Sequence, residues 1–188
     1  MKQAKTLTPQ ELRQAMGQAA MGSHALRNRA MLLMTHLSGM RVGEVAALRV
    51  GDVIDSEGKV KSEIRLQAHQ TKGQEGRTVF VSERLQKELA AYAQSIRKRD
   101  AALPFFMTQK RTGFSANSLT QHFVLFYKRA GLDGASSHSG RRTFITSLAS
   151  QGVSVRVLAA LAGHKSITTT QRYIDVHDNM LRNAVELV

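Results

Sequence analysis

The chain has 188 residues, of which 42% are apolar, and it contains no cysteine. This length supports one hydrophobic core, so we expect a single domain over residues 1–188. The missing cysteine excludes disulfides, thiolate zinc sites and cysteine nucleophiles. The formal net charge of +13 indicates a polyanionic partner, most commonly nucleic acid. Because there is neither an apolar signal core nor a run long enough for a membrane span, we expect a soluble, cytoplasmic protein with no membrane partner.

The N-terminal part of the chain is predicted to be helical. Thr8 and Glu11 have the spacing of a capping box, with a proline at the first helical position, which predicts a helix over about 9–20. A second helix should end at Gly39, and a short third helix should cover 42–48. The second helix is marked by apolar residues at helical spacing, which are Leu26, Ala30, Leu33 and Leu37.

From about 53 to 82 the helical pattern gives way to alternation. A first strand is followed by a glycine-bearing turn at 71–76 and a returning strand at 77–81. The pattern predicts a hairpin in a small antiparallel sheet. The alternating apolar residues of the first strand are Ile64, Leu66 and Ala68.

Two later helices carry tyrosines on their apolar faces. Tyr92 and Tyr127 belong to these faces and are therefore expected in the core, whereas Tyr173 lies in a polar segment and is available for chemistry. The predicted fold class is mainly α with a small antiparallel β-sheet (α+β). The apolar stripes consist of Leu85, Leu89, Tyr92 and Ile96 in one helix, and Leu119, Phe123, Phe126, Tyr127 and Ala130 in the other.

A helix after Gly134 carries an arginine on its buried face. Ile145 belongs to the apolar stripe of this helix, and Arg141 lies four residues earlier on the same face. An inward-facing arginine needs an anion or a carboxylate partner, so Arg141 is a candidate site residue. His138 lies one helical turn before Arg141, or just ahead of the helix start.

Five further residues complete a set suited to phosphoryl transfer. Arg41 stands at a glycine-flanked helix entrance with Glu44 near enough to orient it, Lys72 lies at the hairpin tip, and His164 and Tyr173 share one segment. Guanidinium forks meet the charge that a phosphodiester gathers under attack, a phenol can act as the nucleophile, and a lysine can protonate the leaving oxygen. The set includes no carboxylate cluster for magnesium, which predicts chemistry without metal or cofactor.

In combination these motifs resemble the catalytic domain of the tyrosine recombinases, the phage-integrase family. The resemblance extends from about Thr6 to the C-terminus and is carried by SGMRVGEVAALR, TKGQEGRTVFVS, HSGRR and LAGHKSITTTQRY, in that order. It implies the tyrosine-recombinase catalytic-domain fold. The implied function is site-specific DNA recombination or integration, as in mobile elements, by metal-free strand cleavage and rejoining through a 3′-phosphotyrosine intermediate.

The same resemblance implies a role for each residue of the set. Arg41 and Arg141 would clamp the scissile phosphate, and Tyr173 would form the 3′-phosphotyrosyl link. The other implied roles are general acid for Lys72, acid or base for His138, hydrogen bonding to the phosphate for His164, and support of Arg41 for Glu44. Arg142 and Asp175 depart from the family at positions where histidine is frequent.

The resemblance also implies partners and a domain organisation. The expected partners are double-stranded DNA, further copies of the chain in a tetramer on DNA, and accessory DNA-bending proteins. Family members usually carry an N-terminal core-binding domain, which we expect to be absent because the helix signal starts at Thr8. The tail at 174–188 is predicted either to fold onto its own core or to dock in trans on a neighbouring subunit.

Two other functions fit part of the sequence. Residues 148–173 superficially resemble a helix-turn-helix, which would make the chain a noncatalytic DNA-binding module, but this leaves Arg41 and Lys72 unexplained. A type IB topoisomerase uses the same phosphotyrosine chemistry to relax DNA without exchanging strands. That family tends to have lysine where His138 stands.

Overall fold

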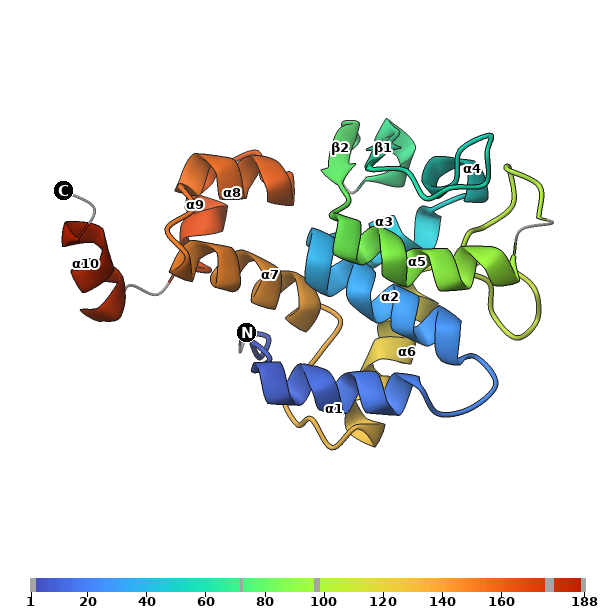
Figure 1. The fold of residues 1–188 in the computed structure, drawn as a ribbon, viewed down its shortest axis with the longest axis horizontal. Helices are drawn as coiled ribbons and strands as arrows, with labels where there is room; N and C mark the ends of the chain where they lie inside the picture. Colours follow the sequence, from blue (N-terminus) through green and yellow to red (C-terminus); the bar gives the residue numbers. More distant parts are fainter. Residues whose placement is uncertain (1–2, 72, 97–98, 175–177, 187–188) are drawn as a thin grey trace.

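The computed structural model describes residues 3–71, 73–96, 99–174 and 178–186. It is mostly helical with one two-stranded sheet (Figure 1). No helix among these residues is long and apolar enough to cross a membrane. In chain order the elements are α1 (Pro9–Ala19), α2 (Ala25–Ser38), α3 (Val42–Ala47), α4 (Val50–Val53), β1 (Glu63–Leu66), the 3-10 helix η1 (Ala68–Gln70), β2 (Arg77–Phe80), α5 (Glu83–Ser95), α6 (Ala116–Arg129), α7 (Ser139–Ser150), α8 (Val155–Ala162), α9 (Ile167–Gln171) and α10 (Asp178–Val185).

Helix α1 starts where its capping box predicts. The Thr8 hydroxyl accepts a hydrogen bond from the Glu11 N–H at 3.2 Å, and the Glu11 carboxylate accepts one from the Thr8 N–H at 2.9 Å. The two bonds satisfy backbone donors that the first helical turn leaves without partners. The predicted helix over about 9–20 is therefore confirmed.

Helix α2 is the centre of the core and packs against α1, α3, α5 and α7 (Figure 1). Residues 30–34 are all buried, so the helix is enclosed on every side in its middle. The predicted apolar face of this helix is wrong at its first and last residues, because Leu26 is 45% exposed and Leu37 is only partly buried. In an enclosed helix, the spacing of a few leucines does not identify a buried face. The helix ends at Gly39, which adopts φ 65°, as expected.

The two strands form the predicted antiparallel hairpin. Glu63 pairs with Phe80 and Leu66 with Arg77. The expectation that Ala68 continues the first strand is wrong, because the chain turns into η1 at this residue. The Gln70 side chain causes the turn by accepting a hydrogen bond from the Gln67 N–H at 2.8 Å, a local bond that competes with strand pairing.

The sorting of the tyrosines is confirmed for the two on helical stripes. Tyr92 on α5 is 4% exposed and Tyr127 on α6 is 1% exposed. The Tyr92 hydroxyl donates to the Phe105 carbonyl at 2.8 Å, and the Tyr127 hydroxyl lies 3.2 Å from His36 Nε2. Both phenols are thus satisfied inside the core.

Helices α2 and α7 approach each other closely at Gly140. A Cβ at this position would lie 2.2 Å from Thr35 Oγ1. We expect Gly140→Ala to lower the free energy of unfolding by about 1–3 kcal/mol through overpacking. Gly17 in α1 has open space around its position, so Gly17→Ala should instead raise this free energy by roughly 0.5–1 kcal/mol. Urea denaturation measures the free energy of unfolding of both variants. A change of the same size and sign in both would contradict the close approach of α2 and α7 at Gly140.

The tail helix α10 projects beyond α8 and α9, away from the body of the molecule (Figure 1). Leu181 and Val185 on this helix are 57% and 69% exposed. Of the two predicted arrangements of the tail, folding onto its own core is therefore not the one that α10 adopts. Docking in trans remains a prediction.

Candidate active site

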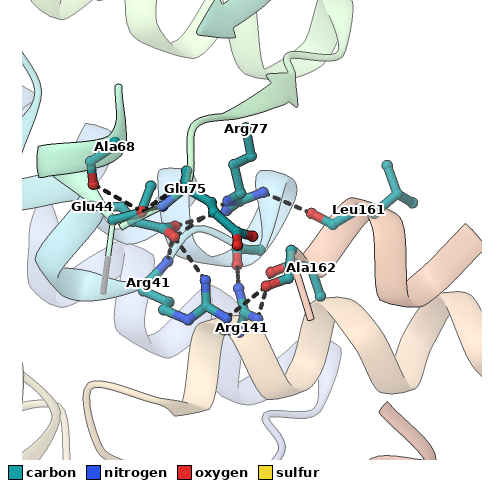
Figure 2. Close-up of polar contacts among 11 residues, drawn as sticks. Arg41, Glu44, Ala68, Glu75, Arg77, Arg141, Leu161 and Ala162 are labelled. Atoms are coloured by element: carbon teal, nitrogen blue, oxygen red, sulfur yellow. Dashed lines mark hydrogen bonds and ion pairs between the residues drawn. The ribbon is translucent and has the colours of Figure 1, made fainter. Parts of the chain in front are cut away.

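The C-terminal end of α8 is the point where three arginines converge (Figure 2). Gly163 follows the helix in the left-handed region at φ 62°. Its N–H donates to the Ala160 carbonyl at 3.1 Å, and the His164 N–H donates to the Ala159 carbonyl at 2.9 Å, which closes the helix. The next three carbonyls accept from guanidinium groups: Leu161 from Arg77 at 2.9 Å, Ala162 from Arg141 at 2.6 Å and Gly163 from Arg41 at 3.0 Å.

Glu44 joins two of these arginines. Its side chain is 1% exposed, with Oε1 2.8 Å from Arg41 Nη1 and Oε2 2.7 Å from Arg77 Nη2. Burial acts to raise the pKa of Glu44, but the bonds from Arg77 and Arg41 outweigh it and hold this pKa below its usual value. The carboxylate is therefore ionised at neutral pH. The expected contact between Glu44 and Arg41 is present.

Arg141 faces inward from α7, as expected, and is 4% exposed. The guanidinium donates to the carbonyls of Gly39 at 2.7 Å and Ala162 at 2.6 Å. These described partners are backbone carbonyls and not the carboxylate that was one of the two expected partners, while the other expected partner, an anion, stays a prediction. Carbonyls at helix ends can satisfy a buried arginine because they have no partner within the helix. Burial, and then the charge of Arg41, lower the pKa of Arg141 to about 10, so it stays cationic at neutral pH.

His164 and Tyr173 lie together. Their rings stack with centroids 5.6 Å apart and an interplanar angle of 23°. His164 Nδ1 lies 2.8 Å from the hydroxyl of Thr170, a fully buried residue of α9. The guanidinium carbon of Arg142 lies 5.7 Å from the centroid of the Tyr173 ring. The half-buried phenol ring is thus positioned by an imidazole and a cation.

The other two predicted catalytic residues are His138 and Lys72, and the structure describes only His138. His138 immediately precedes α7, three residues before Arg141, and is exposed. Its backbone N–H donates to the Ser136 hydroxyl at 3.3 Å. Lys72 lies outside the described residues, as does Asp175, so the assignment of Lys72 as general acid stays a prediction.

A hollow of about 560 Å³ opens between the β1–β2 turn and the segment after α8. Arg41, Arg77 and His164 contribute to its lining. Lys165 and Glu75 also line it and form an ion pair at 2.6 Å, in which both side chains are exposed. A pair this exposed contributes at most about 1 kcal/mol to stability, so an incoming phosphate can compete for Lys165. The hollow is suited to an anion.

Sequence reasoning missed Arg77 as a member of this site. The signal was present in the period of the second strand, since residues two apart in a strand face the same side. Val79 and Val81 are buried, which places Arg77 on the inward face, and its side chain is 11% exposed. A charged residue on the inner face of a strand is a candidate for a buried ion pair.

We expect His164 to be neutral at physiological pH. Burial, followed by the charges of Arg141, Arg41 and Arg77, lowers its pKa to about 4 from the ordinary 6.5. In the unfolded chain His164 takes up a proton at a higher pH than in the folded chain. Its contribution to the free energy of unfolding is therefore fully present above about pH 6.5 and is lost as the pH falls from about 6.5 to about 4. An NMR titration of the histidine ring signals, with His164→Asn to assign the resonance, measures the pKa. A midpoint near 6.5 would contradict this prediction.

Comparison with known proteins identifies the family. The model of the phage integrase family matches residues 5–180. The chain therefore belongs to the phage integrase family.

Individual relatives agree with this assignment. The chain is 30% identical over 165 residues to tyrosine recombinase XerD of Neisseria meningitidis serogroup B, covering 87% of this chain and 55% of the relative. It is 26% identical over 186 residues to tyrosine recombinase XerA of Pyrococcus furiosus, covering 97% of this chain and 61% of the relative. The chain thus spans little more than half the length of these curated relatives.

Solved structures share the fold. A crystal structure of XerA recombinase superposes with a TM-score of 0.79 at 25% identity, covering 100% of this chain and 66% of the other. XerH recombinase bound to its difH substrate gives a TM-score of 0.71 at 21% identity, covering 98% of this chain and 55% of the other. The predicted α+β class and tyrosine-recombinase catalytic-domain fold are confirmed.

Proposed function

We propose that the chain is the catalytic part of a site-specific tyrosine recombinase, which cleaves and rejoins DNA through a 3′-phosphotyrosine intermediate. The observation that carries the proposal is the convergence of Arg41, Arg141 and the His164–Tyr173 pair around the end of α8. Family membership and the recombinase relatives favour this function over a type IB topoisomerase or a noncatalytic module. Residues 1–188 then form one catalytic domain.

The two arginines provide the electrostatic part of the reaction. A guanidinium has several N–H donors, so Arg41 can keep its bonds to Glu44 and Gly163 while it donates to a phosphate oxygen. Arg141 is already desolvated and held from two sides by carbonyls, so little reorganisation is needed when it binds. Preorganised cations stabilise the charge that develops on the non-bridging oxygens.

The remaining residues move protons and form the covalent bond. The Tyr173 oxygen attacks phosphorus and the bond from phosphorus to the 5′ oxygen breaks, with His138 taking the phenol proton and Lys72 protonating the leaving oxygen. When the Thr170 hydroxyl donates to His164 Nδ1, the imidazole proton resides on Nε2 and can be donated to the phosphate. Attack by a 5′ hydroxyl on the phosphotyrosine reverses the bond changes and reseals a strand.

The direct test is covalent trapping on nicked suicide duplexes tiled across the DNA that flanks the gene for this chain, in the presence of chelator. A protease-sensitive adduct on a denaturing gel is the expected result. Binding without an adduct would favour the noncatalytic module. Rapid relaxation of a generic supercoiled plasmid by monomeric protein would favour the topoisomerase.

We further propose that the protein acts on double-stranded DNA in the cytoplasm as a tetramer, assisted by accessory DNA-bending proteins. Exposed Leu181 and Val185 on α10 support docking of the tail on a neighbouring subunit. A chain truncated after Asp178 should bind DNA as before but lose self-association on it, because its apolar docking face is removed. Sedimentation of both forms on DNA measures the difference, and self-association that survives truncation would rule out docking in trans.

A further inference from the structure

We infer that Arg77 is a positioning residue that fixes Arg41 and His164 relative to each other for DNA cleavage. The inference rests on the proposed function and adds a residue to it. Arg77 comes from β2, whereas Arg41 precedes α3 and His164 follows α8, so the three belong to separate parts of the chain. Figure 2 shows Arg77 pointing toward Glu44 on one side and Leu161 on the other.

All three guanidinium nitrogens of Arg77 bond to the protein. Nε and Nη2 donate to the two carboxylate oxygens of Glu44 at 3.3 and 2.7 Å, and Nη1 donates to the Leu161 carbonyl at 2.9 Å. The planar guanidinium makes a two-point contact with the carboxylate and a third contact along a different edge. Each nitrogen has a protein partner and the side chain is 11% exposed, so Arg77 is held in one orientation and in turn holds Glu44 and the Leu161 carbonyl in place.

The contact with Glu44 reaches Arg41. Glu44 Oε1 accepts from both Arg77 Nε and Arg41 Nη1, and Oε2 accepts from Arg77 Nη2 and from the Arg41 backbone N–H at 2.9 Å. Without Arg77, this buried carboxylate would lose one of its two cations and would be free to rotate about its side chain. The orientation of the Arg41 guanidinium would then be less well defined.

The contact with Leu161 reaches His164. Carbonyls 161, 162 and 163 each accept from a different arginine, and His164 is the next residue along the chain. Cations at a helix C-terminus are favourable because the helix dipole places negative charge there. The approach is close at Gly163, where a Cβ would lie 2.5 Å from Arg77 Cδ. Arg77 therefore fixes the start of the segment that presents His164 and Tyr173.

The rate constant for single-turnover adduct formation at saturating suicide duplex shows whether Arg77 acts through its geometry or only through its charge. We expect Arg77→Met to lower the cleavage rate constant by up to about a hundredfold and Arg77→Lys by roughly tenfold, because lysine keeps the charge but loses the fork. The dissociation constant for DNA should stay within about threefold, since the loss is in the chemical step. Arg65→Met, which removes an exposed arginine from β1, is the matched control and should cleave at the wild-type rate.

A double variant tests the route through Glu44. Glu44→Gln combined with Arg77→Met should be little slower than the slower single variant, because both changes release the same carboxylate contact. Fully additive slowing would overturn the inference, as would complete rescue by Arg77→Lys. If Arg77→Met does not fold, as judged by thermal denaturation, Arg77→Lys alone decides.

Different assay results would contradict the positioning role of Arg77 and the proposed recombinase function. A wild-type adduct together with wild-type rates for Arg77→Met would overturn the positioning role alone. Absence of any adduct with the wild-type chain, despite DNA binding, would overturn the proposed function and the inference with it.

Discussion

Tyr173→Phe should abolish covalent attachment to DNA while DNA binding remains close to that of the wild type. The substitution removes the nucleophilic oxygen and keeps the ring, so the stacking on His164 and the contact with the Arg142 guanidinium are retained. Loss of a nucleophile typically costs roughly 10⁴-fold or more in rate, which takes adduct formation below detection. Suicide duplexes on denaturing gels measure the adduct, and gel shifts measure binding.

Tyr127→Phe is the matched control for this result. It also removes one phenol oxygen, but from the core, where the hydroxyl lies 3.2 Å from His36 Nε2. We expect an unchanged rate of adduct formation and a loss of about 0.5–1.5 kcal/mol in the free energy of unfolding. An adduct that persists in Tyr173→Phe would mean that another residue is the nucleophile.

Arg141→Ala is expected to have the second largest effect. Removing this guanidinium takes away one of the two cations that we propose bind the phosphate, and it leaves the carbonyls of Gly39 and Ala162 without these donors inside the protein. Cleavage should slow by about a hundredfold or more, as when one preorganised donor is lost from an oxyanion site. Unfolding should also become easier by roughly 1–3 kcal/mol, because buried acceptors lose their partner.

Two comparisons separate these effects of Arg141. Arg141→Lys restores the charge without the two-point geometry and should recover part of the rate. Arg84→Ala removes an exposed arginine from α5 and should leave both rate and stability unchanged. Wild-type cleavage by folded Arg141→Ala in a single-turnover assay would remove Arg141 from the mechanism.

Local signals in the sequence predicted much of the fold. The capping box at Thr8 defines the start of α1, and the hairpin turn separates two strands with the expected pairing. Such features depend on neighbours in the chain, which a sequence displays directly. Ala68 was misplaced because a glutamine side chain two residues later turns the backbone, a contact that strand alternation does not encode.

The sequence predicted most of the residues that come together in the candidate site, but it did not predict all of the hydrogen bonds that link them. Arg41, Glu44, Arg141, His164 and Tyr173 were expected from residue type and motif order, and the described contacts link them around α8. The carbonyl partners of Arg141 were not predictable, because they depend on where one helix ends and how it packs on another. Residue types do not reveal backbone acceptors, so the sequence predicted only an anion or a carboxylate as the partner of this buried arginine.

The most direct measurement is the identity of the residue that carries the DNA. Trypsin digestion of the trapped adduct, followed by nuclease treatment and mass spectrometry, should place the phosphate on the peptide 173–182, which follows Arg172 and ends at Arg182. The expected product is a 3′-phosphate linked to Tyr173. A phosphate on any other residue, or a link to the 5′ end of the cleaved strand, would contradict it.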